Sequence, residues 1–463
     1  MKKKRSSILL YGIGRSMCKH IFLSAAFLHL SLYKPQLFFW LSFFWLVPIF
    51  YIAIKNKLSF KCGLLWGVFF YLFHLYPITQ LVMSENSILP SFIFSTALIL
   101  YSAFHSGVWL WSIQKMNAFS QNFWWRLFSF MVGTSVYLLW IPYGLLWISG
   151  SVLGYPFSFP LLPLAVFPSL LWALPILGRA VLIFFLVGVS LSIALFFVSQ
   201  KKRFLFFVFL FFLPFLIGCF VSKKEKASSD FFCRCGHVKP LEEHAYAHPL
   251  DAAQELYRRM RALVKKYPHV KYIFMPELSY RFPLNVYPHV VDLWNKNLLK
   301  NEIQLFIGGY RKENGKTFNS LYHIKNGVLD RVYDKCLLVP FVEYIPKKFE
   351  AFSFLKNLFL KDRGMFSPGK YRCTFDCGDG VLCAPHICAE FFFANNKEKN
   401  DFTLLVLNDA VFSSSFFNEL VFLWCAFKAK EQCRNIVVIG YESAFLITTF
   451  GRRKKLFPLH FFS

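Results

Sequence analysis

Residues Gly380–Phe391 read GVLCAPHICAEF, a short apolar run that leads to a cysteine. Its first part, Val381–Cys383, has the β character of a buried strand. If the run is a strand, Cys388 lies where the strand ends and the chain turns. A side chain at such a turn is exposed while its backbone stays rigid, which suits a nucleophile. Most cysteines with apolar neighbours are inert core residues, so a catalytic role needs partners elsewhere in the chain.

The composition indicates membrane spans. The chain has 463 residues, which is enough for two or three domains. Hydrophobic residues make up 56% of it, phenylalanine occurs 60 times, and the mean hydropathy is +0.44. These values lie well above those of ordinary globular proteins, which favours several transmembrane helices.

The charge is strongly basic. The chain has 52 Lys and Arg residues against 25 Asp and Glu residues, which gives a formal net charge of +27. No nucleic-acid-binding motif accompanies this charge, and the basic residues are scattered through apolar sequence. Contact with anionic lipid head groups is the better account. The alternative is that the basic clusters are only solvated surface and topology signals.

The 12 cysteines do not form a recognisable disulfide or metal framework. The pairs Cys233 and Cys235, and Cys373 and Cys377, lack the C-x-x-C and histidine spacing of a structural zinc site. We therefore expect nearly all cysteines to be small apolar fillers, and we predict no metal site.

Residues 1–222 are predicted to form a polytopic α-helical membrane domain. The basic N-terminus, Met1–Arg5, precedes apolar sequence, which favours an uncleaved first span with its N-terminus inside. About seven spans are expected, and the prolines of the sixth predict a broken helix with an interfacial piece. The segments are His20–Tyr33, Gln36–Ile54, Cys62–Met83, Leu89–Ile113, Trp124–Ile148, Leu161–Val198 and Phe204–Val221.

An odd number of spans would place everything after about Ser222 outside the cytoplasm. Basic clusters at Lys55–Lys61 and Lys201–Arg203 agree with cytoplasmic loops. The cluster Lys223–Lys226 disagrees, because it would lie outside. The positive-inside rule therefore supports this topology only weakly.

Residues 223–463 are predicted to form a water-soluble α/β domain, because strands alternate there with helical stretches. Leu250–Tyr267 has the apolar spacing of an amphipathic helix, and Leu420–Lys430 is also helix-like. The predicted strands are Lys271–Met275, Leu305–Tyr310, Phe402–Leu407 and Asn435–Gly440.

Two further segments carry candidate catalytic residues. The predicted strand Lys271–Met275 is followed by Pro276 and Glu277, and a carboxylate at a strand's end can serve as a general base. Lys335 lies in an apolar stretch that also holds Glu343, and a lysine there is costly to bury unless it is paired. The alternatives are a solvated or capping glutamate and an ordinary surface lysine. With Cys388, these residues could supply a base, an oxyanion-stabilising cation and a nucleophile.

These segments together resemble a known family. The quoted pieces are Pro276-Glu277, Y-x-K-x-x-L-V-P-F-x-E-Y-x-P at Tyr333–Pro346, and Ile387-Cys388-x-Glu390. They resemble the Glu-Lys-Cys motifs of the nitrilase superfamily, and with the preceding spans they resemble the apolipoprotein N-acyltransferases of the bacterial envelope. Supporting pieces are Phe318-Asn319-Ser320, Phe366-Ser367-Pro368-Gly369, Asn408-Asp409-Ala410 and Leu153-Gly154-Tyr155.

The resemblance implies a role for each of these side chains. Cys388 would accept an acyl chain as a thioester, Glu277 would be the general base, and Lys335 would stabilise the oxyanion. Glu343 would orient Lys335 or share its charge, and Glu390 would support the nucleophile. The implied fold is a nitrilase-like αββα sandwich outside the cytoplasm, which follows the membrane domain.

The resemblance also implies the substrates and the location. The acyl donor would be a phospholipid, and the acceptor would be the N-terminal α-amine of diacylglyceryl-cysteine in an apolipoprotein. The reaction would follow a ping-pong course, complete lipoprotein maturation and need no cofactor. The protein would lie in the bacterial inner membrane among membrane lipids, with its catalytic domain on the periplasmic side and no nucleic-acid partner.

The chain also departs from the family's pattern. Ala389 stands where a tyrosine usually follows the nucleophile, Val342 replaces a glycine, and Val411 stands where an aromatic residue is usual. The last residues, Leu456–Ser463, stop where the family continues, so we expect a catalytic domain that is incomplete at its C-terminus. Three alternatives remain: an inactive shortened member, a membrane-attached nitrilase-type C–N hydrolase, and a non-enzymatic polytopic protein such as a transporter.

Overall fold

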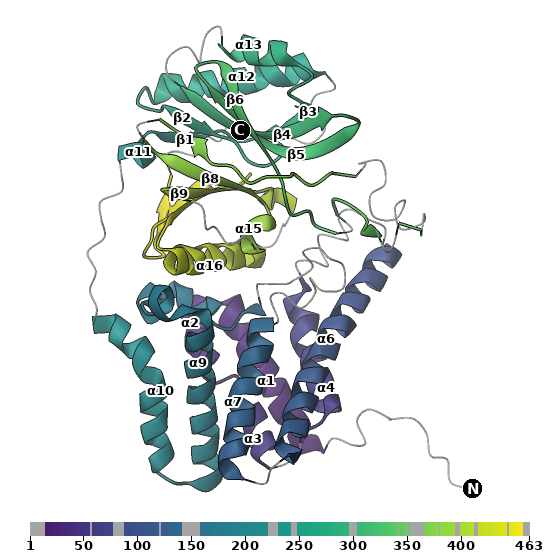
Figure 1. Cartoon of the computed structure of the whole chain (residues 1–463), viewed down its shortest axis with the longest axis vertical. Coiled ribbons are helices and arrows are strands. Elements are labelled where there is room, and N and C mark those ends of the chain that lie inside the picture. Colours follow the sequence, from purple (N-terminus) through teal and green to yellow (C-terminus); the bar gives the residue numbers. More distant parts are fainter. Residues whose placement is uncertain are drawn as a thin grey trace. The chain divides into compact units, whose positions relative to one another are not determined.

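The computed structural model divides into two compact units (Figure 1). The first unit comprises Met1–Gly144, Tyr155–Lys223 and Ser414–Glu431, and the second comprises Leu145–Gly154, Lys224–Ser413 and Gln432–Ser463. The structure describes residues 14–55, 58–76, 88–119, 122–140, 158–220, 230–241, 248–295, 303–340, 342–347, 350–351, 365–378, 380–393, 399–411, 415–441 and 444–456.

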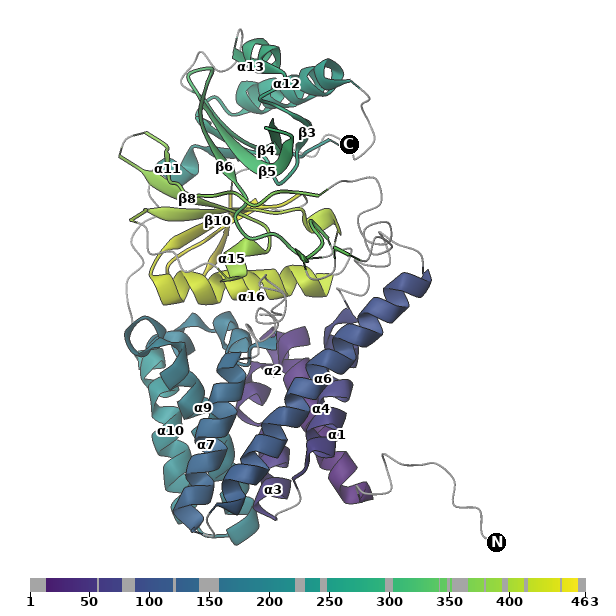
Figure 2. The ribbon, with the colours of Figure 1, turned by 45° about the vertical axis from the view of Figure 1, so that its right-hand side comes forward.

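The first unit is a bundle of apolar helices. Helices α9 and α10 lie side by side, as do α4 and α6 (Figures 1 and 2). The elements are α1 (Arg15–Tyr33), α2 (Pro35–Phe38), η1 (Phe39–Phe43), α3 (Val47–Ile54), α4 (Phe60–His74), α6 (Ile88–Ala118), α7 (Phe123–Trp140), η3 (Leu162–Val166), η4 (Pro168–Leu171), α9 (Leu174–Ser199) and α10 (Arg203–Phe220).

Among the residues described, four helical segments are long and apolar enough to cross a membrane. They are Pro35–Ile54, Ser91–Ala118, Leu174–Ser199 and Arg203–Phe220. Helix α4 is apolar but shorter. The chain therefore has the character of a membrane protein, while the number of seven spans stays a prediction. Residues 77–87 and 141–157, in which two of the predicted spans end, lie outside the described part.

The segment predicted to be a broken helix is interrupted as its prolines suggest. It begins with the short 3₁₀ helices η3 and η4, and α9 follows from Leu174. Within α9, Gly178 has a φ of +75°, which breaks the helical geometry and which glycine adopts without steric cost. The turn predicted at Lys34 and Pro35 is present, because α1 ends at Tyr33 and α2 begins at Pro35.

Helix α16 (Ser415–Gln432) is grouped with the apolar helices, although it follows residue 222 in the chain. Near its C-terminus, Glu431 accepts two hydrogen bonds from Arg179, each of 2.8 Å. The ring of Phe159 packs edge-on against Trp424 and Phe427 of this helix. A two-pronged ion pair and aromatic packing thus hold α16 within the first unit.

The second unit contains two six-stranded sheets. In the first sheet the strand order is β1-β2-β4-β5-β6, and β3 pairs with β4. Its strands are β1 (Cys235–His237), β2 (Tyr272–Phe274), β3 (Tyr280–Pro283), β4 (Gln304–Glu313), β5 (Lys316–Lys325) and β6 (Val328–Asp334), and its helices are α11 (Asp230–Cys233), α12 (Pro249–Lys266) and α13 (Pro288–Trp294).

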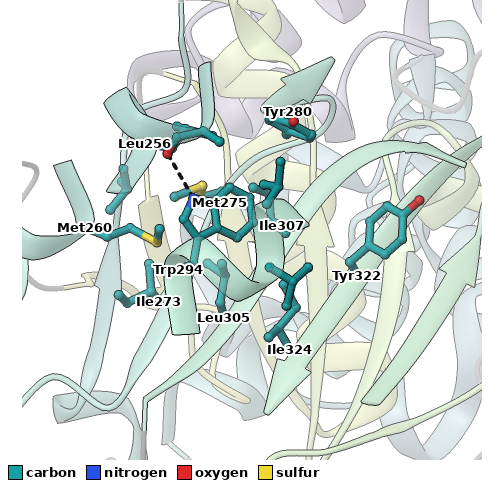
Figure 3. Close-up of a cluster of buried hydrophobic side chains, with 14 of the residues drawn as sticks. Leu256, Met260, Ile273, Met275, Tyr280, Trp294, Leu305, Ile307, Tyr322 and Ile324 are labelled. Atoms are coloured by element: carbon teal, nitrogen blue, oxygen red, sulfur yellow. Dashed lines mark hydrogen bonds between the residues drawn. The ribbon is translucent and has the colours of Figure 1, made fainter. Parts of the chain in front are cut away.

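Helices α12 and α13 cover one face of the first sheet (Figure 3). Helix α12 begins with a proline, and Leu256, Met260 and Leu263 form its buried stripe at helical spacing. This stripe packs with Trp294 and with strand residues such as Ile273. The indole N–H of Trp294 donates to the carbonyl oxygen of Ala253 at 2.9 Å, which ties the two helices together.

In the second sheet the strand order is β12-β11-β10-β9-β8-β7, and β8, β9 and β10 run parallel. The elements are β7 (Phe375–Asp376), β8 (Leu382–Ile387), α15 (Glu390–Phe393), β9 (Phe402–Val406), η8 (Asp409–Val411), β10 (Asn435–Ile439), β11 (Ala444–Ile447) and β12 (Arg453–Lys455).

A second apolar cluster joins the two sheets, because it combines Phe274 and Phe306 of the first with Leu404 and Val437 of the second. The second unit therefore has helix, sheet and sheet layers, which is the predicted α/β architecture. The helix that follows η8 in the chain, α16, belongs to the first unit by its contacts. The complete αββα sandwich therefore stays a prediction.

Candidate active site

Glu277 follows the end of strand β2 and lies in a tightly built turn. Its side chain is buried, and the next residue, Leu278, has a φ of +52°, in the left-handed region that non-glycine residues rarely adopt. Gly308 on β4 makes room for this turn, because a Cβ at that position would lie 2.4 Å from the carbonyl oxygen of Pro276. Close packing thus holds the backbone around Glu277 in a strained conformation.

Lys335 follows the end of strand β6 and is 1% exposed. Its N–H donates to the carbonyl oxygen of Asn319 at 2.9 Å, and its own carbonyl oxygen accepts from the N–H of Gly369 at 2.8 Å. Gly369 is needed for this approach, since a Cβ there would lie 2.3 Å from the carbonyl oxygen of Asp334. Backbone hydrogen bonds on both sides therefore position a buried lysine.

Cys388 follows strand β8, as predicted, with a φ of +51°. Its N–H donates to the carbonyl oxygen of Val406 at 2.7 Å. Cys388 is partly exposed, whereas Glu277 and Lys335 are buried. Cys388 is thus the partly exposed residue of the group and lies in a strained turn.

The structure brings the predicted side chains together. Nζ of Lys335 lies 2.9 Å from Oε1 of Glu343 and 3.6 Å from Oε1 of Glu277. The thiol of Cys388 lies within electrostatic range of all three charged groups. One cation is therefore shared by two carboxylates beside a thiol, and all four groups belong to the second unit.

Asn319, on strand β5, connects the two carboxylates. Its Nδ2 donates to Oε1 of Glu277 at 2.8 Å and to Oε1 of Glu343 at 3.2 Å. The second oxygen of each carboxylate accepts from a backbone N–H, that of Asn408 at 3.1 Å and that of Val339 at 2.8 Å. The motif Phe318-Asn319-Ser320 belongs to the resemblance, but no pattern in the sequence predicts this role for Asn319.

Glu390 lies two residues after Cys388, and its hydrogen bonds go to the backbone and to a tyrosine. Its Oε1 accepts from the hydroxyl of Tyr333 at 2.8 Å and from the N–H of Ile387 at 2.6 Å. Its Oε2 accepts from the N–H groups of Cys336 at 3.0 Å and Leu337 at 3.4 Å. Glu390 thus joins the turn that carries Cys388 to the segment that carries Lys335.

Burial and charge shift the pKa values of these groups. Burial raises the pKa of the Cys388 thiol above its usual value, and the negative charge of Glu277 raises it further. Burial opposes the charged form of Lys335, but Glu343 and Glu277 outweigh it and raise the pKa of this lysine. Burial also raises the pKa of Glu390, against the effect of its hydrogen bonds. The resting state therefore has a neutral thiol beside a charged ammonium.

Other parts of the predicted pattern are placed as follows. Asp409 accepts a hydrogen bond from the N–H of Tyr441, and Gly440 packs against its carboxylate. Residues 153–155, which belong to the resemblance, and residues 457–463, at which the chain departs from the family's pattern, lie outside the described residues. Among the residues that are described, no group of three or more His, Cys, Asp or Glu side chains is arranged to hold a metal ion.

Comparison with known proteins gives one sequence match and several distant structural likenesses. No family model matches the chain. An apolipoprotein N-acyltransferase from Thermotoga maritima is 28% identical over 169 residues. The aligned part covers 34% of this chain and 32% of that protein, so the match spans about a third of the relative.

Three solved structures illustrate the structural likenesses. A CN-hydrolase superfamily protein from Xanthomonas campestris is 14% identical, with a TM-score of 0.34 over 47% of this chain and 84% of that one. A nitrilase-superfamily protein from Saccharomyces cerevisiae is 12% identical, with a TM-score of 0.34 over 47% and 83%. A glutamine-dependent NAD+ synthetase from Acinetobacter baumannii is 16% identical, with a TM-score of 0.36 over 48% and 42%.

Proposed function

We propose that this protein transfers an acyl chain from a membrane phospholipid to the N-terminal α-amine of diacylglyceryl-cysteine in apolipoproteins. The proposal depends chiefly on one observation: the buried side chains of Glu277 and Lys335 lie 3.6 Å apart, within electrostatic range of the thiol of Cys388. Base, cation and nucleophile are the groups that acyl transfer through a covalent intermediate requires.

In the first half-reaction, Glu277 takes the proton of the Cys388 thiol while the sulfur attacks the ester carbonyl carbon of the phospholipid. A C–S bond forms and the negative charge moves to the carbonyl oxygen, where the ammonium of Lys335 stabilises it. The C–O bond then breaks, and Glu277 returns the proton to the departing alkoxide. The products are a lysophospholipid and a thioester on Cys388.

In the second half-reaction, the free amine of the acceptor attacks the thioester carbon. Glu277 takes a proton from the attacking nitrogen, a C–N bond forms, and the C–S bond breaks. The sulfur recovers the proton from Glu277, and the acceptor leaves as an amide. One cysteine that serves two substrates in turn implies ping-pong kinetics.

Membrane-spanning helices in the same chain support lipid substrates. Each buried methylene of an acyl chain contributes about 0.8 kcal/mol to membrane binding, so extraction of a two-chain lipid into water is very unfavourable. An enzyme held in the membrane by the apolar helices of the first unit would meet such substrates without extracting them. We further propose that the protein lies in a bacterial inner membrane with its second unit on the periplasmic side.

The experiment combines the purified full-length protein in detergent with a fluorescent phospholipid and a synthetic diacylglyceryl-cysteine peptide. The proposal predicts that the peptide gains the labelled chain as an amide, and that Cys388→Ser abolishes this transfer. Cys233→Ser, which alters an exposed cysteine of α11, is the matched control and should transfer normally. Release of the labelled fatty acid to water alone would instead support a hydrolase, and no turnover of either kind would contradict both.

A further inference from the structure

We propose that Asn319 is a positioning residue that holds the carboxylate of Glu277 beside that of Glu343, in the place from which it can take the proton of the Cys388 thiol. The inference rests on the proposed function, because it assigns a part to a side chain in the same site. It goes further by naming what allows two buried carboxylates to share one lysine.

The two carboxylates of the cluster need a donor besides the lysine. Glu277 and Glu343 share one ammonium group, and Lys335 is nearer to Glu343, at 2.9 Å, than to Glu277, at 3.6 Å. Asn319 Nδ2, at 2.8 Å from Oε1 of Glu277, supplies the shorter contact. Two like charges this close repel each other. Without this donor, Glu277 would move out of its place beside Glu343 and could no longer face the thiol of Cys388.

The amide of Asn319 suits this task. Its side chain is 1% exposed, and the two hydrogens of Nδ2 can serve one carboxylate each. Among the described residues, Oδ1 of Asn319 has no hydrogen-bond partner. The reverse orientation would place this oxygen against the two carboxylates, so the side chain acts here as a donor. An aspartate would replace the donor by a third acid.

Strand β5 fixes the place of this amide relative to the lysine. The carbonyl oxygen of Asn319 accepts from the N–H of Lys335 at 2.9 Å, so one residue contacts the lysine through its backbone and both carboxylates through its side chain. The neighbour Ser320 donates from its hydroxyl to Oδ1 of Asp334 at 2.6 Å and makes no such bridge. Ser320 therefore offers a matched control on the same strand.

The test measures alkylation of Cys388 by iodoacetamide, which needs no lipid. The full-length protein in detergent is treated across a range of pH, and the peptide that contains Cys388 is followed by mass spectrometry. The variants are Asn319→Leu, which keeps the size but loses the donor, Asn319→Asp, and the control Ser320→Ala. The titratable groups around Glu277 are Lys335, Glu343 and Cys388 itself.

We expect Asn319→Leu to lower the alkylation rate at neutral pH about tenfold and to make the rate rise with pH, because a displaced Glu277 no longer takes the proton of the thiol. Asn319→Asp should lower the rate at least as far, whereas Ser320→Ala should keep the wild-type rate and profile even if it unfolds more easily. An unchanged rate and profile in Asn319→Leu, or an equal change in Ser320→Ala, would overturn the inference. If the rate changes as expected while the wild type transfers no acyl chain, the inference holds and the proposed function fails.

Discussion

Oε1 of Glu343 lies 2.9 Å from Nζ of Lys335, and both side chains are buried. A buried ion pair contributes little net stability when it is complete, because desolvation offsets attraction. Removal of one partner is far more harmful, since it leaves the other charge buried without compensation. We therefore expect stability and the proposed catalysis to depend on the same lysine.

Replacement of that lysine tests both consequences. Lys335→Met should lower acyl transfer by about 10²–10³-fold, because the oxyanion loses its cation. It should also lower the free energy of unfolding by about 3–5 kcal/mol, because Glu277 and Glu343 remain without the ammonium. Both quantities can be measured on the detergent-solubilised protein, by the transfer assay and by thermal unfolding.

The matched control is Lys325→Met. Nζ of Lys325 lies 3.5 Å from Oδ2 of Asp376 in a pair that solvent reaches, and such pairs contribute about 0–1 kcal/mol. This variant should keep its activity and most of its stability. A Lys335→Met protein that is as stable and as active as Lys325→Met would refute the role of the buried pair.

We expect proton transfer between Cys388 and Glu277 to give the alkylation rate of Cys388 an unusual pH dependence. Burial and the charge of Glu277 raise the pKa of the thiol, so the free thiolate is scarce at neutral pH. In the wild type the proton can pass from the thiol to Glu277, and this internal transfer does not change with pH while the pair holds one proton. The alkylation rate of Cys388 should therefore reach a plateau around neutral pH.

Glu277→Gln removes the internal acceptor. Its thiolate forms only by loss of the proton to solvent, so the rate should rise about tenfold per pH unit until the pH reaches the pKa of the thiol. The measurement is the slope of the logarithm of the alkylation rate against pH. Equal slopes in the wild type and in Glu277→Gln would show that Glu277 does not receive the proton.

Substitution of Gly308 should affect acyl transfer through the backbone. A Cβ at this position would lie 2.4 Å from the carbonyl oxygen of Pro276 and 2.8 Å from Cα of Glu277, and backbone atoms there cannot yield easily. Gly308→Ala should displace Glu277 and lower acyl transfer at least tenfold, because catalysis is sensitive to small misplacements of the base.

Gly236→Ala is the control in the same sheet. The three atoms nearest to its new Cβ would be side-chain ends of Leu263 and Val270, which can shift. We expect some loss of stability and little loss of transfer per folded molecule. If Gly308→Ala were as active as Gly236→Ala, the close fit between β4 and the turn at Glu277 would not matter for the reaction.

At position 390 we expect an isosteric amide to be a poor substitute for the carboxylate of Glu390. Its two oxygens accept four hydrogen bonds, three of them from backbone N–H groups. In Glu390→Gln one acceptor becomes an N–H donor that faces a backbone N–H, which should cost about 1–3 kcal/mol. The expected results are a lower unfolding temperature and a reduced kcat. A variant with wild-type stability and kcat would contradict the connection between the Cys388 turn and the Lys335 segment.

The sequence predicted the local elements of the second unit well. The helix expected at Leu250–Tyr267 is α12, and the strands expected at Leu305–Tyr310 and Phe402–Leu407 lie in β4 and β9. Strong apolar periodicity and short β-rich runs determine such elements locally. The turn position of Cys388 was also predictable, because a strand run ends directly before it.

Other features depend on residues far apart in the chain. The pairing of α16 with the first unit involves Arg179 and Glu431, and no local pattern links them. The bridge from Asn319 to Glu277 and Glu343 arises because β2, β5 and the segment after β6 meet in space. A single asparagine in a strand gives no sign of this role, since its donors are used only when the fold brings the two acids to it.

The most direct measurement is the mass of the full-length protein after incubation with a phospholipid and no acceptor. The account predicts the gain of one acyl group on Cys388, its removal by hydroxylamine as expected for a thioester, and its transfer to a diacylglyceryl-cysteine peptide added later. Cys388→Ser should carry no thioester. An acyl group on another residue, or acyl transfer that persists in Cys388→Ser, would contradict the account.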